Sequence, residues 1–155
     1  MIYWTCKPFA NLTLTQLYAA LRLRSQVFVV EQNCPYLDLD GLDEAAFHLL
    51  GHTADGALAA YTRLLPRGVS YPDCASIGRV VVTPAQRGSG LGQALMRESI
   101  ATCERLFGPG PLKIGAQQYL AKFYEGLGFA QCGAEYEEDG IPHLPMRRGE
   151  ASGPS

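Results

Sequence analysis

The sequence predicts an α/β fold (an α+β mixed sheet with helices packed on it) in the element order β-α-β-β-β-α-β-α-β-β. Two stretches carry this prediction. Residues 77–92 contain a β-branched apolar strand, a short turn and a glycine-rich loop that opens onto a helix. Residues 119–129 contain a short helix with one apolar face, which Gly128 ends just before another strand.

Length and composition favour a single domain. The chain has 155 residues, of which 47% are hydrophobic and 18% charged, with a net charge of −2. We expect one domain over residues 1–148 and a flexible tail over residues 149–155. No basic patch predicts binding to nucleic acid or to a membrane surface, and no apolar run approaches the roughly 20 residues that span a bilayer. The five scattered cysteines and the absence of an export signal predict a cytoplasmic protein without disulfides or zinc.

The first third of the chain predicts a strand, a long helix and an acidic loop. Residues 2–7 are aromatic and β-branched, and Thr13 and Gln16 have the spacing of a capping box that begins a helix. The apolar face of this helix, which we expect to end near Glu31, comprises Leu14, Leu17, Tyr18, Leu21 and Phe28. Residues 31–44 then form a loop of five carboxylates, whose spacing does not fit a calcium loop.

The rest of the chain alternates strands and helices. Asp55-Gly56 predicts a hairpin turn, and Gly108-Pro109 ends the helix that follows the glycine-rich loop. The predicted elements are strands at 48–53, 57–65 and 75–82, a helix at 91–107, a strand at 112–116, the short helix, a strand from Phe129, an acidic turn at 135–140 and a last strand at 141–147.

The loop at residues 87–92 has the features of a phosphate site. Gly88, Gly90 and Gly92 remove side chains where the chain meets a helix N-terminus, whose N–H groups are unpaired and whose dipole is positive. Their spacing matches neither the dinucleotide fingerprint nor the P-loop. By itself the loop therefore predicts either a pyrophosphate site or an ordinary strand–loop–helix corner.

Three motifs together resemble a known family. Arg87-x-x-Gly90-x-Gly92, directly after a V-x-V strand end, resembles the acetyl-CoA pyrophosphate loop of the GNAT superfamily of N-acetyltransferases. The F-Y-x-x-L-G-F run at 123–129 and the order of elements are similar to the same superfamily. The stretches LRLRSQVFVVEQNCPYLDLDGLDE, IGRVVV and DGIPHLPMRR resemble its ElaA-type branch, and the resemblance extends from Trp4 to Arg148.

The resemblance implies a GNAT fold with a splayed central sheet and a site for acetyl-CoA. Strands 75–82 and 112–116 would be parallel neighbours that diverge to admit the pantetheine arm, whose amides would pair with the backbone of Val80 and Val82. The pyrophosphate would be held by N–H groups of the loop, with added charge from Arg87. The loop residues concerned are Arg87, Gly88, Ser89, Gly90, Leu91 and Gly92.

The implied reaction is direct transfer of the acetyl group to a primary amine of a small molecule or protein, without a metal or a covalent enzyme intermediate. Tyr124 matches the position of the family's general acid. A phenol, with a pKa of about 10, stays protonated at neutral pH, whereas the leaving thiol has a pKa of about 8.5. The competing interpretation of Tyr124 is a core residue on the apolar helix face.

The proton acceptor is left open, because strand 75–82 lacks the glutamate that many relatives carry there. Glu31 is the first candidate, on the expectation that Asp40 or Asp43 raises its pKa, and His143 is the second. We expect the acidic loop to attract a cationic acceptor. The alternative function is a non-catalytic acyl-CoA-binding module that uses this loop for a partner. The identity of the acceptor and the oligomeric state are also left open.

Overall fold

The structure is a computed structural model that describes residues 1–149. The tail predicted at 149–155 lies, apart from Gly149, outside the described residues. The elements are β1 (Tyr3–Pro8), α1 (Leu14–Arg24), the π-helix η2 (Ser25–Glu31), β2 (Phe47–His52), β3 (Leu58–Leu65), β4 (Ala75–Val82), α2 (Leu91–Phe107), β5 (Leu112–Gln117), α3 (Ala121–Glu125), β6 (Ala130–Gln131), β7 (Tyr136–Glu138) and β8 (Ile141–Arg148). The mixed α/β class is confirmed.

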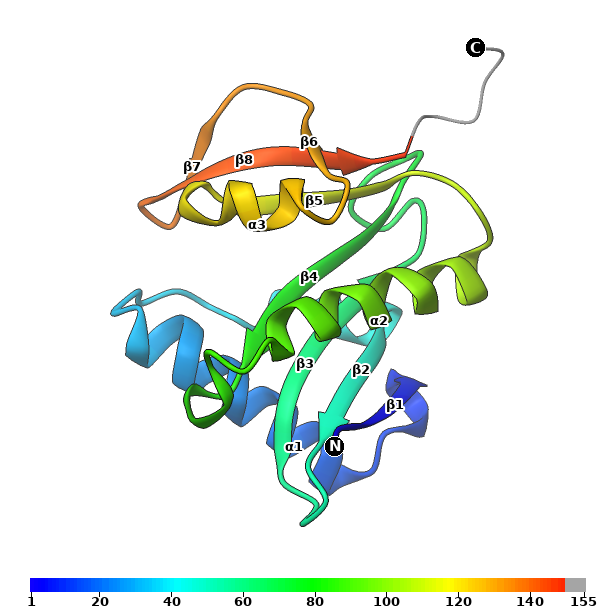
Figure 1. The fold of residues 1–155 in the computed structure, drawn as a ribbon, viewed down its shortest axis with the longest axis vertical. Coiled ribbons are helices and arrows are strands. Elements are labelled where there is room, and N and C mark those ends of the chain that lie inside the picture. Colours follow the sequence, from blue (N-terminus) through cyan, green and yellow to red (C-terminus); the bar gives the residue numbers. More distant parts are fainter. Residues whose placement is uncertain (150–155) are drawn as a thin grey trace.

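The strands form one mixed sheet in the order β1-β2-β3-β4-β5-β8-β6, with β7 also paired to β8. The central pair, β4 and β5, is parallel and is joined only where Ala75 meets Leu112 and Ser76 meets Lys113. Beyond these residues the two strands diverge, and Figure 1 shows β4 running away from β5. The splayed sheet implied by the resemblance is therefore present.

Helices cover both faces of the sheet. In Figure 1, α1 lies on one face, and α2 and α3 lie on the other. The larger core contains Leu95 and Met96 of α2 and Tyr124 of α3, together with strand residues. The smaller core packs Leu23 of α1 and Val27 of η2 against the opposite face.

The first helix begins as the sequence predicts but buries a different face. The capping box is confirmed, since the Thr13 hydroxyl accepts from the Gln16 N–H and the Gln16 side chain accepts from the Thr13 N–H, both at 3.0 Å. The predicted apolar face is wrong in part, because Leu14 is 87% exposed and Tyr18 is 73% exposed. Arg24 is instead fully buried on the inward face. A hydrophobic pattern cannot predict this orientation, because partners far along the chain neutralise the arginine.

The partners of Arg24 come from the acidic loop. Its guanidinium donates to Asp38 at 2.9 Å through Nε and to Asp43 at 2.7 Å through Nη1. Arg63 of β3 also donates to Asp43, at 3.1 Å. Such pairs offset the large cost of removing charges from water.

The remaining aspartate of the loop is held in the same way. Arg63 binds both oxygens of Asp40 at 2.8 Å, and Arg79 of β4 lies 3.4 Å from Asp40 and 2.8 Å from Asp38. These three aspartates do not support the expectation that the loop attracts a cationic acceptor, because three arginines neutralise them. The carboxylates join α1, the loop and the sheet.

A second correction concerns the predicted acidic turn at 135–140. Tyr136–Glu138 is the strand β7, which pairs antiparallel with β8 so that Tyr136 faces His143 across the ladder. The turn itself is only Asp139-Gly140, both with positive φ. The three residues of β7 are all exposed, so they show no apolar alternation that would have predicted a strand.

Candidate active site

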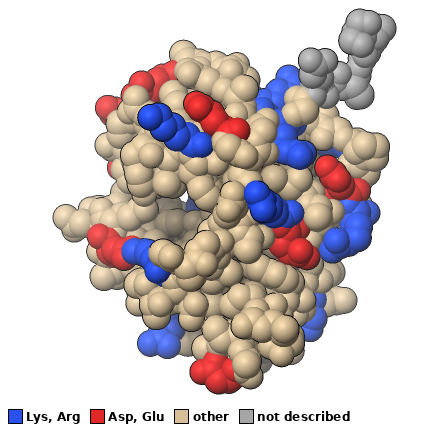
Figure 2. Space-filling view, in the orientation of Figure 1, with Lys and Arg blue, Asp and Glu red and all other residues tan. Residues whose placement is uncertain are grey.

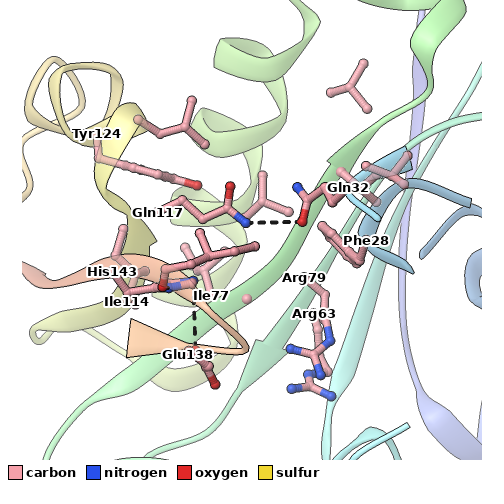
Figure 3. Close-up of a pocket in the computed structure, with 18 of the residues that line it drawn as sticks. Phe28, Gln32, Arg63, Ile77, Arg79, Ile114, Gln117, Tyr124, Glu138 and His143 are labelled. Carbon is pink, nitrogen blue, oxygen red and sulfur yellow. Dashed lines mark hydrogen bonds and ion pairs between the residues drawn. The ribbon is translucent and has the colours of Figure 1, made fainter. Parts of the chain in front are cut away.

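The divergence of β4 and β5 opens a cavity of about 970 Å³. Its walls come from distant parts of the chain: the end of η2, the loop after it, β4, the glycine loop, β5, α3 and the β7–β8 hairpin. Figure 2 shows the hollow in the surface, and Figure 3 shows the side chains inside it. The cavity therefore joins the predicted glycine loop to both predicted catalytic regions.

At one end of the cavity, the glycine loop presents unpaired backbone donors. Gly88 and Gly90 have φ values of 81° and 80°, and a Cβ on either would meet nothing within 4 Å. Among the described residues, no N–H from Gly88 to Gly92 donates to a backbone carbonyl, and Gly90 begins α2 without a side-chain cap. Free N–H groups at a helix N-terminus, beside two glycines with open space around them, fit a phosphate group.

The other residues predicted to bind the cofactor fall into two groups, one on β4 and one in the glycine loop. Val80 and Val82 line the cavity on the part of β4 that has no partner in β5, so this strand edge is open to a ligand's amides. Leu91 is buried in the core, and the Ser89 hydroxyl donates to the Gln86 carbonyl at 2.5 Å. These two residues contribute their backbone to the loop.

Arg87 and Glu31 form an ion pair beside the glycine loop. Arg87 donates through Nη1 and Nη2 to the two Glu31 oxygens, each at 2.6 Å. These hydrogen bonds lower the pKa of Glu31 and raise the pKa of Arg87. The expectation that Asp40 or Asp43 raises the pKa of Glu31 is wrong, because both aspartates are bound by arginines of the network.

Tyr124 lies in the wall of the cavity between the two ends. Its ring makes edge-to-face contacts with Phe123 and Phe129, at centroid distances of 5.2 and 6.0 Å. The residue is 6% exposed, and its hydroxyl is directed into the cavity (Figure 3). Burial raises the pKa of Tyr124 to about 12. The site therefore keeps this phenol protonated.

His143 projects from β8 into the same cavity. Its Nδ1 lies 2.7 Å from the Ile141 carbonyl. A carbonyl only accepts hydrogen bonds, so we assign the proton of the neutral ring to Nδ1, which leaves the lone pair on Nε2. Nε2 lies 3.9 Å from the Glu138 carboxylate, and the Tyr136 ring stacks on the imidazole at 5.6 Å. The arrangement prepares Nε2 to accept a proton.

The sequence alone did not indicate several residues of the cavity. Gln117 of β5 donates to Gln32 across it at 3.4 Å, as Figure 3 shows. Tyr136 and Glu138 enter it because β7 is a strand, which places alternate side chains on one face. Residues 136 and 138 alternate with Glu137, as side chains on one face of a strand do. Because position 138 holds a glutamate and not an apolar residue, the pattern predicted a turn.

Two broader features of the described chain bear on the site. Within residues 1–149, no three or more His, Cys, Asp or Glu side chains are placed to hold a metal ion. In the same part of the chain, no helix is both long and apolar enough to cross a membrane.

The splayed sheet and the open glycine loop are features expected of a CoA-dependent acyltransferase, and comparison with known proteins supports this class. Residues 26–149 match the family model of the acetyltransferase (GNAT) domain, so the chain belongs to the GNAT family. Family membership supports acyl transfer from CoA, without specifying the acyl group or the acceptor.

The similar proteins confirm the resemblance to the ElaA-type branch. The chain is 45% identical to protein ElaA of Escherichia coli strain K12 over 150 residues, which cover 96% of this chain and 97% of that protein. It superposes on the crystal structure of E. coli ElaA with a TM-score of 0.88 and 44% identity, covering 96% and 99% of the two chains. It matches the structure of an acyl-CoA N-acyltransferase from Pseudomonas aeruginosa with a TM-score of 0.90 and 46% identity, covering 96% and 100%.

Proposed function

We propose that this chain is an N-acetyltransferase that transfers the acetyl group of acetyl-CoA directly to a primary amine. The observation that carries the proposal is the continuous cavity. It runs from a loop of free N–H groups, past the unpaired edge of β4, to the hydroxyl of Tyr124 and the imidazole of His143. Acetyl-CoA, when bound, supplies a thioester that an amine can attack.

The residues that fit acetyl-CoA are those of the loop and of β4. We assign the pyrophosphate to the N–H groups of residues 88–92 and the pantetheine amides to the backbone at Val80 and Val82. A guanidinium has five N–H donors, and Glu31 occupies two of those of Arg87. We therefore assign Glu31 the role of orienting Arg87, whose remaining donors are available to a phosphate.

We assign to Tyr124 the role of a hydrogen-bond donor to the CoA sulfur as it departs. A pKa of about 12 lies well above the roughly 8.5 of a thiol, so full proton transfer from the phenol to the thiolate is unfavourable. A hydrogen bond from the hydroxyl stabilises the negative charge as the carbon–sulfur bond breaks. The buried, low-dielectric position strengthens such a bond.

His143 is the group that we favour for the amine proton. As the carbon–nitrogen bond forms, the amine loses a proton to the Nε2 atom of His143. Histidine is the side chain that most readily exchanges protons near neutral pH. Glu31 is less suited to this task, because Arg87 stabilises its charged form.

The alternative of a non-catalytic binding module rested on the glutamate missing from β4 and on an acidic loop free to recruit a partner. The three aspartates of that loop are paired with arginines, so the loop no longer favours the module.

The proposal is tested by measuring thiol release from acetyl-CoA across a panel of primary amines, with the product identified by mass. Amine-dependent release and an acetylated amine are expected, and a longer acyl-CoA assayed in parallel reports the acyl preference. If CoA raises the melting temperature but no amine stimulates release, the protein is a binding module and the proposal fails.

A further inference from the structure

The charged residues that line the cavity are not all neutralised. Each of the three arginines in its wall is paired: Arg87 with Glu31, and Arg63 and Arg79 with Asp40. Glu138 lines the cavity without a lysine or arginine partner among residues 1–149, and so does Asp139 in the turn after it. The unpaired charge that lines the cavity is therefore negative, and it lies on the β7–β8 hairpin, where the Glu138 side chain is 61% exposed.

This charge lies beyond the reacting groups. Figure 3 shows Tyr124, His143 and Glu138 in that order along one wall. The His143 side chain is only 10% exposed, and within the described chain its Nε2 has no hydrogen-bond partner, with Glu138 at 3.9 Å as its nearest carboxylate. A ring nitrogen of a mostly buried histidine that lines a cavity and has no hydrogen-bond partner in the protein is placed to meet a ligand's polar group.

Two contacts narrow the cavity near the β7–β8 hairpin. Gln32 bonds to Gln117, and the Cys34 thiol contacts the Asp139 carbonyl at 3.4 Å. Both contacts join the loop after η2 to the opposite wall. An acceptor must pass beside them, which favours a slender chain over the flat surface of a folded protein.

We propose that the acceptor is a slender aliphatic diamine: one amine reacts beside His143, and the Glu138 carboxylate binds the second as an ammonium ion. The inference rests on the proposed function and names its substrate class. An ammonium fits this position because the Glu138 carboxylate lines the cavity without a lysine or arginine partner among residues 1–149. A carboxylate at the same position would be repelled by Glu138, and the nearby guanidinium groups already bind aspartates.

The test compares three acceptors of equal chain length that differ only at the far end: putrescine, butylamine and γ-aminobutyrate. The kcat/KM for each is measured with saturating acetyl-CoA in the wild type, in Glu138→Gln and in Glu137→Gln. Glu137 is the matched control, because it is the adjacent carboxylate on β7 and does not line the cavity.

In the wild type we expect putrescine to be the best acceptor and γ-aminobutyrate the poorest. Glu138→Gln should reduce kcat/KM for putrescine by about tenfold, the range of a hydrogen bond to a charged group. It should reduce kcat/KM for butylamine much less, while Glu137→Gln changes neither. Because butylamine shares the reacting amine but lacks the second ammonium, the difference between the two separates recognition of the tail from an effect on His143.

Two outcomes overturn the inference. Equal losses for putrescine and butylamine would assign Glu138 to His143 alone. A preference for γ-aminobutyrate that is lost in Arg79→Gln would make the subsite one for carboxylates. Both leave the proposed function standing, since an amine is still acetylated, whereas an absence of release with all amines refutes the function itself.

Discussion

Arg24 is a fully buried charge whose partners come from a loop that follows it in the chain. A guanidinium in this position suits Asp38 and Asp43 because its planar fork binds two carboxylates at once. Removing Arg24 would leave the buried Asp38 and Asp43 without this arginine partner and without access to water. The residue is therefore required for the fold, although it lies near the cavity.

Replacement of Arg24 by alanine is expected to lower the free energy of unfolding by about 3–5 kcal/mol, the cost of breaking a buried ion pair on one side. Arg22→Ala is the control, because Arg22 lies in the same turn of α1 and is exposed. It should change the free energy by less than about 0.5 kcal/mol. Urea unfolding of the two variants measures the difference, and equal small effects would contradict the structural role of Arg24.

Tyr124 is expected to act through its hydroxyl alone. Tyr124→Phe keeps the ring packed against Phe123 and Phe129, so acetyl-CoA affinity should change little. The kcat should fall by about 10²–10³, because the departing sulfur loses its hydrogen-bond donor. Tyr119→Phe, at an exposed tyrosine that also lines the cavity, should retain most of its activity. A Tyr124→Phe enzyme with the wild-type kcat would return this residue to a packing role.

At the scale of elements, the junction of β4 with α2 is where we propose that a phosphate binds. The two positive-φ glycines turn the chain so that N–H groups point outward, and α2 adds its dipole behind them. A side chain at Gly90 would project into the open space in front of the loop. A side chain at Gly90 would affect both CoA binding and the stability of a backbone with positive φ. A second glycine with positive φ, away from the cavity, separates the two effects.

Gly90→Ala and Gly56→Ala are expected to lower the melting temperature in the absence of ligand by similar amounts. Both positions have positive φ, 80° and 87°, and neither has atoms within 4 Å of the added Cβ. Only Gly90→Ala should reduce the rise in melting temperature that CoA produces, because Gly56 lies in the β2–β3 turn. The assignment of the loop would be refuted by an undiminished rise in Gly90→Ala, as measured by thermal shift over a range of CoA concentrations.

At the scale of the whole molecule, the arginine–aspartate network joins α1, the following loop and two strands on one side of the cavity. Burial alone would raise the pKa of Asp40, but hydrogen bonds from Arg63 and from the Leu42 N–H outweigh it and lower this pKa to about 2. The pKa of Asp43 is likewise lowered by its arginine partners in spite of burial. The network is therefore stabilised by the charged form of both carboxylates.

Stability is expected to fall in acid for this reason. An aspartate whose pKa is lower in the folded state than the roughly 3.9 of an unfolded chain contributes fully above that value, and the contribution is lost as the pH falls toward 2. Urea unfolding at a series of pH values should show little change from these groups between pH 7 and 5, and a decline below about pH 4. The Asp40→Asn variant should show a shallower decline, and an identical slope would contradict the assignment.

Much of the fold follows from local patterns. The strand at 75–82 and the helix at 91–107 lie where the sequence predicts them, because apolar periodicity and glycine or proline boundaries are local properties. The glycine loop and the position of Tyr124 were likewise identified from short motifs. Strand β7 was not, since its exposed residues acquire their conformation only by pairing with β8.

The sequence by itself determined most of the elements, the family and the position of the glycine loop, because these depend on neighbours within a few positions. Only the tertiary structure decided which charges are neutralised. Glu31 meets Arg87 across 56 positions of sequence, and Arg24 meets Asp43 across 19. An isolated acidic run looks the same whether it faces solvent or arginines. Its charge becomes available to a substrate only where packing leaves it unpaired, and we propose that in this cavity Glu138 is such a position.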